Sequence, residues 1–139
     1  MRRLLYVDTS AYLCLLLGET GANEVAERFA AAEPCSSVLL VLEARRSVVH
    51  LGRTGRIRAE RVGTLLGQLQ VDSAKIVLRD LTLDLALDLA FPAVRTPRSL
   101  DLVHLRTALW FHRREPLDGY LTNDEGQRAA ARELGLPVG

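Results

Sequence analysis

Four acidic residues in this sequence stand where apolar stretches end or are interrupted. Asp8 closes the apolar run LLYV, and Asp124 follows the short segment GYLTN. Asp101 opens the segment LDLVHLRTAL, and Glu43 interrupts the apolar run SSVLLVL. A buried carboxylate is costly unless it is hydrogen-bonded, paired with a cation or bound to a metal. Each of the four positions therefore needs a specific physical reason.

Each carboxylate also has a purely structural explanation. Asp8 and Asp124 suit helix N-termini, where a side-chain oxygen accepts hydrogen bonds from free backbone amides. Asp101 falls in the first turn of a helix, and Glu43 can pair with Arg46 one turn later. Taken one at a time, Asp101 and Asp124 fit the structural explanation better than a functional one, whereas Glu43 fits it least.

Taken together, the four acids indicate metal chemistry. Asp8 and Asp124 follow strands, and parallel strands place such residues at the carboxyl edge of a sheet, where active sites lie. Ionised carboxylates gathered there repel one another, and a divalent cation removes the repulsion. Ligands that are all oxygen select hard ions such as Mg²⁺ or Mn²⁺. One or two such ions suit the hydrolysis of a phosphodiester.

Short apolar runs alternate with segments of helical periodicity along the chain. Strands are predicted, in order, at 4–7, around 35, at 74–81, at 119–123 and, as a last short strand, at 136–139. Helices are predicted at 9–17, 20–33, from 36 or 37 to near 52, at 56–70, 82–92, 100–115 and 124–135. Thr9 or Ser10 can cap the first helix, and Gly18 ends it. The alternation predicts an α/β sandwich around a parallel sheet.

Length and composition favour one globular domain over residues 1–139. Of the 139 residues, 48% are hydrophobic and 25% are charged, which allows a substantial core. The net charge is +1, so no general basic field indicates nucleic acid, although arginine supplies all but one of the 18 basic residues and suits phosphate binding. No apolar run reaches the roughly 18 residues of a membrane span. We expect a cytoplasmic protein that does not associate with membranes.

Four blocks of the sequence resemble, in order and rough spacing, the acidic blocks of PIN-domain proteins. They are YVDTSAYL, SSVLLVLEARRSV, RSLDLVHLRTAL and YLTNDEGQRAAARELGLPV. The resemblance extends over essentially the whole chain and is closest to the VapC-type toxin ribonucleases. The first and third blocks are the most specific, whereas Glu43 in the second is placed mainly by order.

The resemblance implies a three-layer α/β/α sandwich around a mostly parallel sheet and Mg²⁺- or Mn²⁺-dependent cleavage of RNA. It implies that the catalytic, metal-binding acids are Asp8, Glu43, Asp101 and Asp124. It also implies that the hydroxyls of Ser10 and Thr122 support the site. Asp124 and Glu125 both qualify as the fourth acid, and Asp124 is preferred because it stands nearer the strand end.

The resemblance also implies partners, namely an RNA substrate, a small antitoxin that blocks the active site, and a second copy in a homodimer. An alternative is a PIN-like module that binds RNA or protein without catalysis. A phosphatase of the haloacid-dehalogenase type or a phospho-receiver would use Asp8 as its nucleophile. Both of those classes need a lysine after a late strand, and the only lysine, Lys75, opens a strand.

Basic and imidazole side chains near the acidic blocks have two interpretations each. Arg95 and Arg98 lie in a predicted loop before Asp101, where contacts to RNA phosphates and simple solvation are about equally supported. His104 follows Asp101 by one helical turn. We expect a packed histidine beside the site rather than a general base.

Overall fold

The computed structural model describes residues 3–96 and 98–138, and these form four strands and seven helices. The strands are β1 (Leu4–Val7), β2 (Glu33–Ser37), β3 (Val77–Arg79) and β4 (Gly119–Leu121). The helices are α1 (Thr9–Leu17), α2 (Ala22–Ala31), α3 (Leu39–Arg53), α4 (Ala59–Ser73), α5 (Leu83–Leu87), α6 (Ser99–Arg114) and α7 (Glu125–Glu133).

The four strands form one sheet in the order β3-β2-β1-β4, and every pair is parallel. Helices cover both faces, so the predicted three-layer α/β/α sandwich around a parallel sheet is confirmed. The two inner strands, β1 and β2, are almost completely buried. Because all strands run the same way, the residues that follow β1, β2 and β4 meet at one edge.

Strand β1 shows how the sequence divides the core into two layers. Successive side chains of a strand point to opposite faces of a sheet. Leu4 and Tyr6 accordingly pack into one apolar cluster with α6 and α7, whereas Leu5 and Val7 pack into a second with α1, α3 and α4. A strand buried on both faces reads as a continuous apolar run, which is what LLYV is.

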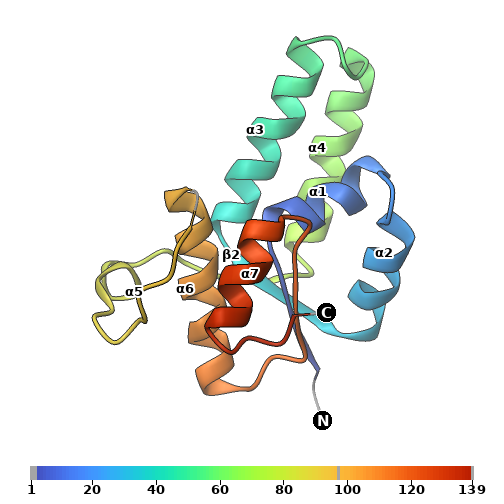
Figure 1. Cartoon of the computed structure of the whole chain (residues 1–139). Coiled ribbons are helices and arrows are strands. Elements are labelled where there is room, and N and C mark those ends of the chain that lie inside the picture. Colours follow the sequence, from blue (N-terminus) through green and yellow to red (C-terminus); the bar gives the residue numbers. More distant parts are fainter. Residues whose placement is uncertain (1–2, 97, 139) are drawn as a thin grey trace.

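Figure 1 shows the resulting arrangement: α6 and α7 lie on one side of the sheet, and the α3–α4 hairpin rises beyond its carboxyl edge. Helix α1 ends as predicted at Gly18, whose φ of 67° lets its amide bond back to the carbonyls of Cys14 and Leu15. Gly119 at the start of β4 is needed for space, because a Cβ there would lie 3.0 Å from Leu5 Cδ1 and still closer to the Arg28 guanidinium.

The helix predicted at 82–92 was too long, since α5 ends at Leu87. Asp88 ends it by turning its side chain back, so that Oδ1 accepts a hydrogen bond from the amide of Ala90. Arg106 from α6 then donates to the carbonyls of Leu85 and Asp88, which no longer have helical partners. Local side-chain bonding therefore overrides the helical periodicity here.

Other boundaries differ by a few residues from those predicted. The helix expected at 56–70 begins later, as α4, and the strand expected at 74–81 is only the three residues of β3. At the carboxyl end Val138 makes an isolated parallel bridge to Tyr120 instead of a strand, and residue 139 lies outside the described part. Within the described ranges, no helix is both long enough and apolar enough to cross a membrane.

Candidate active site

Asp8 caps helix α1 and faces the carboxyl edge of the sheet. The residue is 4% exposed, and its Oδ1 accepts hydrogen bonds from the Ala11 amide at 3.0 Å and from the Ser10 hydroxyl at 2.7 Å. Of the three residues expected as possible caps, Asp8 is thus the N-cap, and Thr9 and Ser10 are not. Asp8 therefore caps the helix through one carboxylate oxygen, and the residue also lines the pocket.

Ser10 ties Asp8 to the end of β4. The Ser10 hydroxyl lies 3.2 Å from that of Thr122, and it also accepts a hydrogen bond from the Asn123 amide at 2.9 Å. Thr122 in turn accepts from the Asp124 amide at 3.1 Å. The two predicted hydroxyls therefore lie together and connect the acids that follow β1 and β4.

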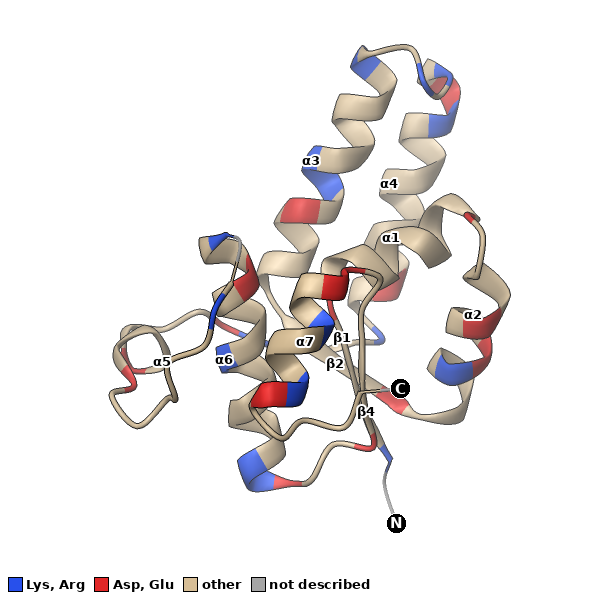
Figure 2. Cartoon of the chain, in the orientation of Figure 1, with Lys and Arg blue, Asp and Glu red and all other residues tan. Residues whose placement is uncertain are grey.

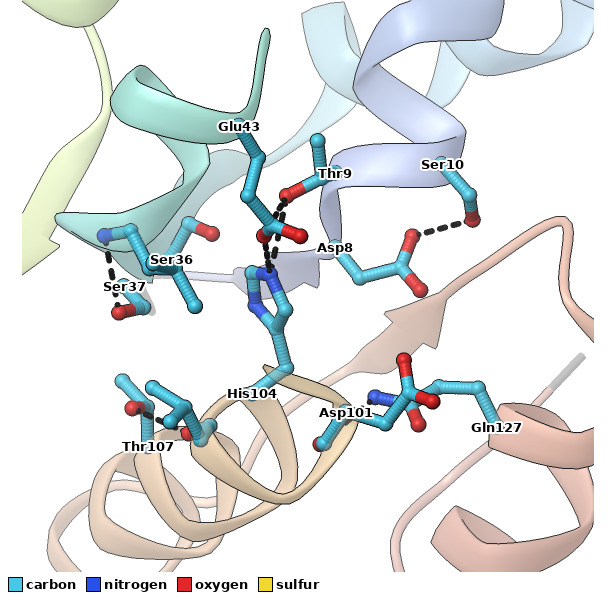
Figure 3. Close-up of polar contacts among 12 residues, drawn as sticks. Asp8, Thr9, Ser10, Ser36, Ser37, Glu43, Asp101, His104, Thr107 and Gln127 are labelled. Carbon is cyan, nitrogen blue, oxygen red and sulfur yellow. Dashed lines mark hydrogen bonds and ion pairs between the residues drawn. The ribbon is translucent and has the colours of Figure 1, made fainter. Parts of the chain in front are cut away.

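Glu43 on α3 is held by two side chains from other elements. Its Oε1 accepts hydrogen bonds from the Thr9 hydroxyl at 2.6 Å and from His104 Nε2 at 2.9 Å (Figure 3). Arg46, expected as a possible partner, has none of these contacts and points to solvent instead. The partner of the Glu43 carboxylate is therefore His104 from α6 and not Arg46, which lies one turn further along α3.

His104 connects this carboxylate to the core. Its side chain is almost fully buried, and its Nδ1 lies 2.8 Å from the Tyr6 hydroxyl while Nε2 also lies 2.9 Å from Thr9 Oγ1. An ionised carboxylate only accepts hydrogen bonds, so Nε2 carries the proton. In the neutral imidazole, Nδ1 then accepts from Tyr6. The predicted packed histidine beside the acids is confirmed.

Asp101, in the first turn of α6, has an oxygen without a hydrogen-bond partner. The residue is 8% exposed, and its Oδ2 is buried and unbonded among the described residues. This oxygen forms an ion pair with Arg98 Nε at 3.6 Å, a distance too long for a hydrogen bond. Gln127 from α7 donates to the Asp101 carbonyl at 3.1 Å and to the Tyr120 hydroxyl at 2.7 Å, which fixes α6 against α7.

Asp124 caps α7 by accepting a hydrogen bond from the Gln127 amide at 2.9 Å, and it also lines the acidic pocket. Glu125 instead pairs with Arg128, and its side chain is 85% exposed. This geometry favours Asp124 as the fourth acid. Of the two predicted RNA-contacting arginines, Arg98 lines the same pocket, whereas Arg95 lines a separate cavity against α7.

All four predicted acids line one cavity of about 160 Å³ at the carboxyl edge of the sheet. Its walls also include residues that were not predicted to belong to the site, notably Thr9, Leu13 and Ser47. Thr9 was used only as a possible helix cap, although its position beside Asp8 was a signal. Ser47, one turn after Glu43 on α3, carried a similar signal in its spacing.

The pKa values of Asp8 and Glu43 are shifted in opposite directions. Burial raises the pKa of Asp8 above its ordinary value, and the hydrogen bonds to Thr122, Ala11 and Ser10 do not fully offset it. Burial also acts to raise the pKa of Glu43, but the hydrogen bonds from His104 and Thr9 outweigh it and bring that pKa below its ordinary value. The hydrogen bonds to Asp8 thus fail to offset its burial, whereas those to Glu43 do.

The chemistry of this pocket fits a hard divalent cation. Its acids offer only oxygen, Asp101 has a buried oxygen that accepts no hydrogen bond from any described residue, and both hydrogen bonds to Glu43 go to the same oxygen. In this conformation no three Asp, Glu, His or Cys side chains of the described residues stand close enough to hold one ion. Binding therefore requires the carboxylates to draw together by side-chain rotation.

The family model for the PIN domain matches residues 5–133 of this chain. The match covers most of the sequence and contains all four acids, so the chain belongs to the PIN domain family. It has a fold of the nuclease type, which agrees with the parallel sheet and with acids gathered at its carboxyl edge. No curated protein matches the chain.

Proposed function

We propose that the protein is a Mg²⁺- or Mn²⁺-dependent endoribonuclease, formed by a single PIN-like domain over residues 1–139. The observation that supports this most is that four acids from four parts of the sequence line one pocket in a PIN-domain fold. Carboxylates alone make that pocket unfavourable, and a divalent cation makes it favourable. Phosphodiester hydrolysis is the reaction that such a site suits.

In this proposal the cation is held by Asp8, Glu43, Asp101 and Asp124. When bound, it supplies positive charge that acidifies the attacking water and stabilises the charge that develops on the phosphate. Thr9 and His104 keep Glu43 oriented, and Ser10 with Thr122 keeps Asp8 oriented. Arg98, at the pocket wall, contacts a phosphate of the RNA, and Arg95 contacts RNA farther away.

Cleavage of total cellular RNA tests the proposal. Purified protein is incubated with RNA and Mg²⁺ or Mn²⁺, beside an EDTA control and the variant Asp8→Asn, which keeps the size and removes the charge. Asp118→Asn is the matched control, because Asp118 is exposed and lies before β4, at the other edge of the sheet. We expect discrete cuts that need metal and Asp8 but not Asp118. Equal cutting by wild type and Asp8→Asn would refute the assignment.

We further propose that the protein is the toxin of a VapBC-type pair, acts in the cytoplasm, and forms a homodimer inhibited by a small antitoxin. This rests on the resemblance of the acidic blocks to VapC-type toxins. Induced expression in a bacterial host should arrest growth, and co-expression of the neighbouring reading frame should relieve the arrest. An arrest that Asp8→Asn also produces would argue against toxicity by RNA cleavage.

A further inference from the structure

Three cavities lie in series along helix α3 and connect the acidic pocket to the outer surface. The acidic pocket shares Ser10, Leu13 and Ser47 with a second cavity of about 420 Å³ between α1 and α3. That second cavity shares Arg46 and His50 with a third, of about 400 Å³, on the outer side of α3. We call the second and third cavities together the α3 groove.

The sequence of α3 places basic side chains along this groove at helical spacing. Glu43, Arg46, His50 and Arg53 follow one another at intervals of three and four residues, which puts them on one face of the helix. At a rise of about 1.5 Å per residue, the stripe extends about 15 Å from the acidic pocket. Figure 2 shows the basic segments of α3 following its acidic segment towards the hairpin tip.

The basic side chains of the groove are available to a ligand. Arg45, Arg46 and Arg53 are exposed, and none of them forms an ion pair or side-chain hydrogen bond with a described residue. By contrast, Arg113 and Arg128 each pair with an acid elsewhere on the surface. Among the described residues, Glu19 is the only one with a carboxylate in the walls of the groove.

We propose that the α3 groove binds the single-stranded RNA that leads into the acidic pocket, with Arg46 and Arg53 contacting phosphates and His50 stacking on a base. The inference rests on the proposed ribonuclease function and adds the path of its substrate. Arginine forks match phosphate oxygens, and imidazole and guanidinium planes accept unstacked bases. Leu13 and Leu42 supply apolar wall against which a base can lie.

Continuity of the cavities selects RNA over an acidic protein segment. An RNA chain with one phosphodiester in a pocket of about 160 Å³ must continue outside that pocket. The acidic pocket and the groove share walls at Leu13 and Ser47, so the groove offers the RNA a path. An extended single strand fits such a path because its backbone is charged throughout and its bases are free to turn to either wall.

Binding is measured by fluorescence anisotropy with a labelled 12-nucleotide single-stranded RNA, in Mg²⁺, with Asp101→Asn as the background so that RNA is not cut. The test variant adds Arg46→Gln and Arg53→Gln. The matched control adds Arg3→Gln and Arg132→Gln, which remove the same charge from exposed positions away from the groove. A third variant, with Arg46→Lys and Arg53→Lys, keeps the charge.

We expect the test variant to bind about tenfold or more weakly, with the slope of log affinity against log salt reduced by about 1.4, the value for two lost single-strand phosphate contacts. The lysine variant should keep the salt slope, and the control should match the background protein. Equal loss in the test variant and the control would overturn the proposal, as would unchanged binding in the test variant. The proposal would also be overturned if polyglutamate bound as tightly as RNA and if the same two arginine substitutions abolished that binding.

This binding experiment and the cleavage assay of the proposed function, read together, separate the two proposals. If wild type cuts no RNA with any metal but RNA binding still depends on the two arginines, the proposed RNA-binding groove is supported and the proposed nuclease activity is wrong. If wild type cuts RNA and the test variant binds RNA normally, the nuclease stands and the groove fails.

Discussion

The two sides of the acidic pocket are built differently. On the Glu43 side, a chain of hydrogen bonds runs from Tyr6 through His104 to the carboxylate, with Thr9 closing it. On the Asp101 side, a buried oxygen has no hydrogen-bond partner among the described residues, and the neighbouring Asp8 has a pKa raised by burial. The protein therefore completes one side with its own side chains and leaves the other side unfavourable, as expected where a cation belongs.

The largest expected effect is on RNA cleavage and comes from the Asp101 side of the pocket, which the protein's own hydrogen bonds leave incomplete. Asp101→Asn should lower RNA cleavage by about 1000-fold or more, equivalent to about 4 kcal/mol, because it removes a proposed cation ligand. The free energy of unfolding of the metal-free protein should change little, because the change removes a buried charge whose ion pair with Arg98, at 3.6 Å, is too long for a hydrogen bond. Urea denaturation in EDTA measures this stability, and a marked loss would show that Asp101 serves the fold.

The complete side should respond in the opposite way. His104→Ala leaves Glu43 and the Tyr6 hydroxyl without their partner and opens a cavity, so it should cost about 3 kcal/mol of stability in EDTA. Tyr6→Phe removes only the outer hydrogen bond and should cost about 1 kcal/mol. If His104→Ala is no more costly than Asp101→Asn, the contrast between the two sides is wrong.

Added metal should stabilise the wild type through the incomplete side. At a Mn²⁺ concentration about 100 times the dissociation constant, the gain in free energy of unfolding should be about 2.7 kcal/mol. Isothermal titration gives the dissociation constant, and thermal unfolding gives the shift in midpoint. Asp101→Asn should abolish most of the gain and Asp118→Asn should retain it. A gain that survives Asp101→Asn would place the cation elsewhere.

The smallest effect is a difference in the pH dependence of stability, measured in EDTA between about pH 3 and pH 7. The folded pKa of Asp8 lies above its ordinary 3.8, so the native state binds the proton more tightly and stability falls as the pH rises through that folded pKa. The folded pKa of Glu43 lies below its ordinary 4.5, so its contribution is present above 4.5 and is lost as the pH falls through the folded pKa.

Two variants separate these contributions. Asp8→Asn should remove the loss of stability that occurs as the pH rises above 3.8, and Glu43→Gln should remove the loss that occurs as the pH falls below 4.5. Urea midpoints at a series of pH values measure both. If the two variants change the pH profile in the same direction, the pKa values of the two carboxylates are not shifted in opposite directions and this prediction is wrong.

The sequence by itself determined where the two strands that lead to Asp8 and Asp124 end. The run LLYV followed by Asp8, and GYL followed by Thr122 and Asp124, follow from local apolar patterning, because a strand buried on both faces must be apolar until it reaches solvent. The alternation of strands and helices then fixed the parallel sheet, and parallel strands brought these acids to one edge.

Only the tertiary structure decided what those acids touch. His104 bonds Glu43 across 61 residues of sequence, and Ser10 meets Thr122 across 112. Tertiary packing also formed the α3 groove, whose walls come from α1 as well as α3. It helped to end α5 as well, where Arg106 and Asp88 bond the backbone beyond Leu87. Spacing within one element fixes which side chains share a face, but contacts between elements depend on how those faces pack.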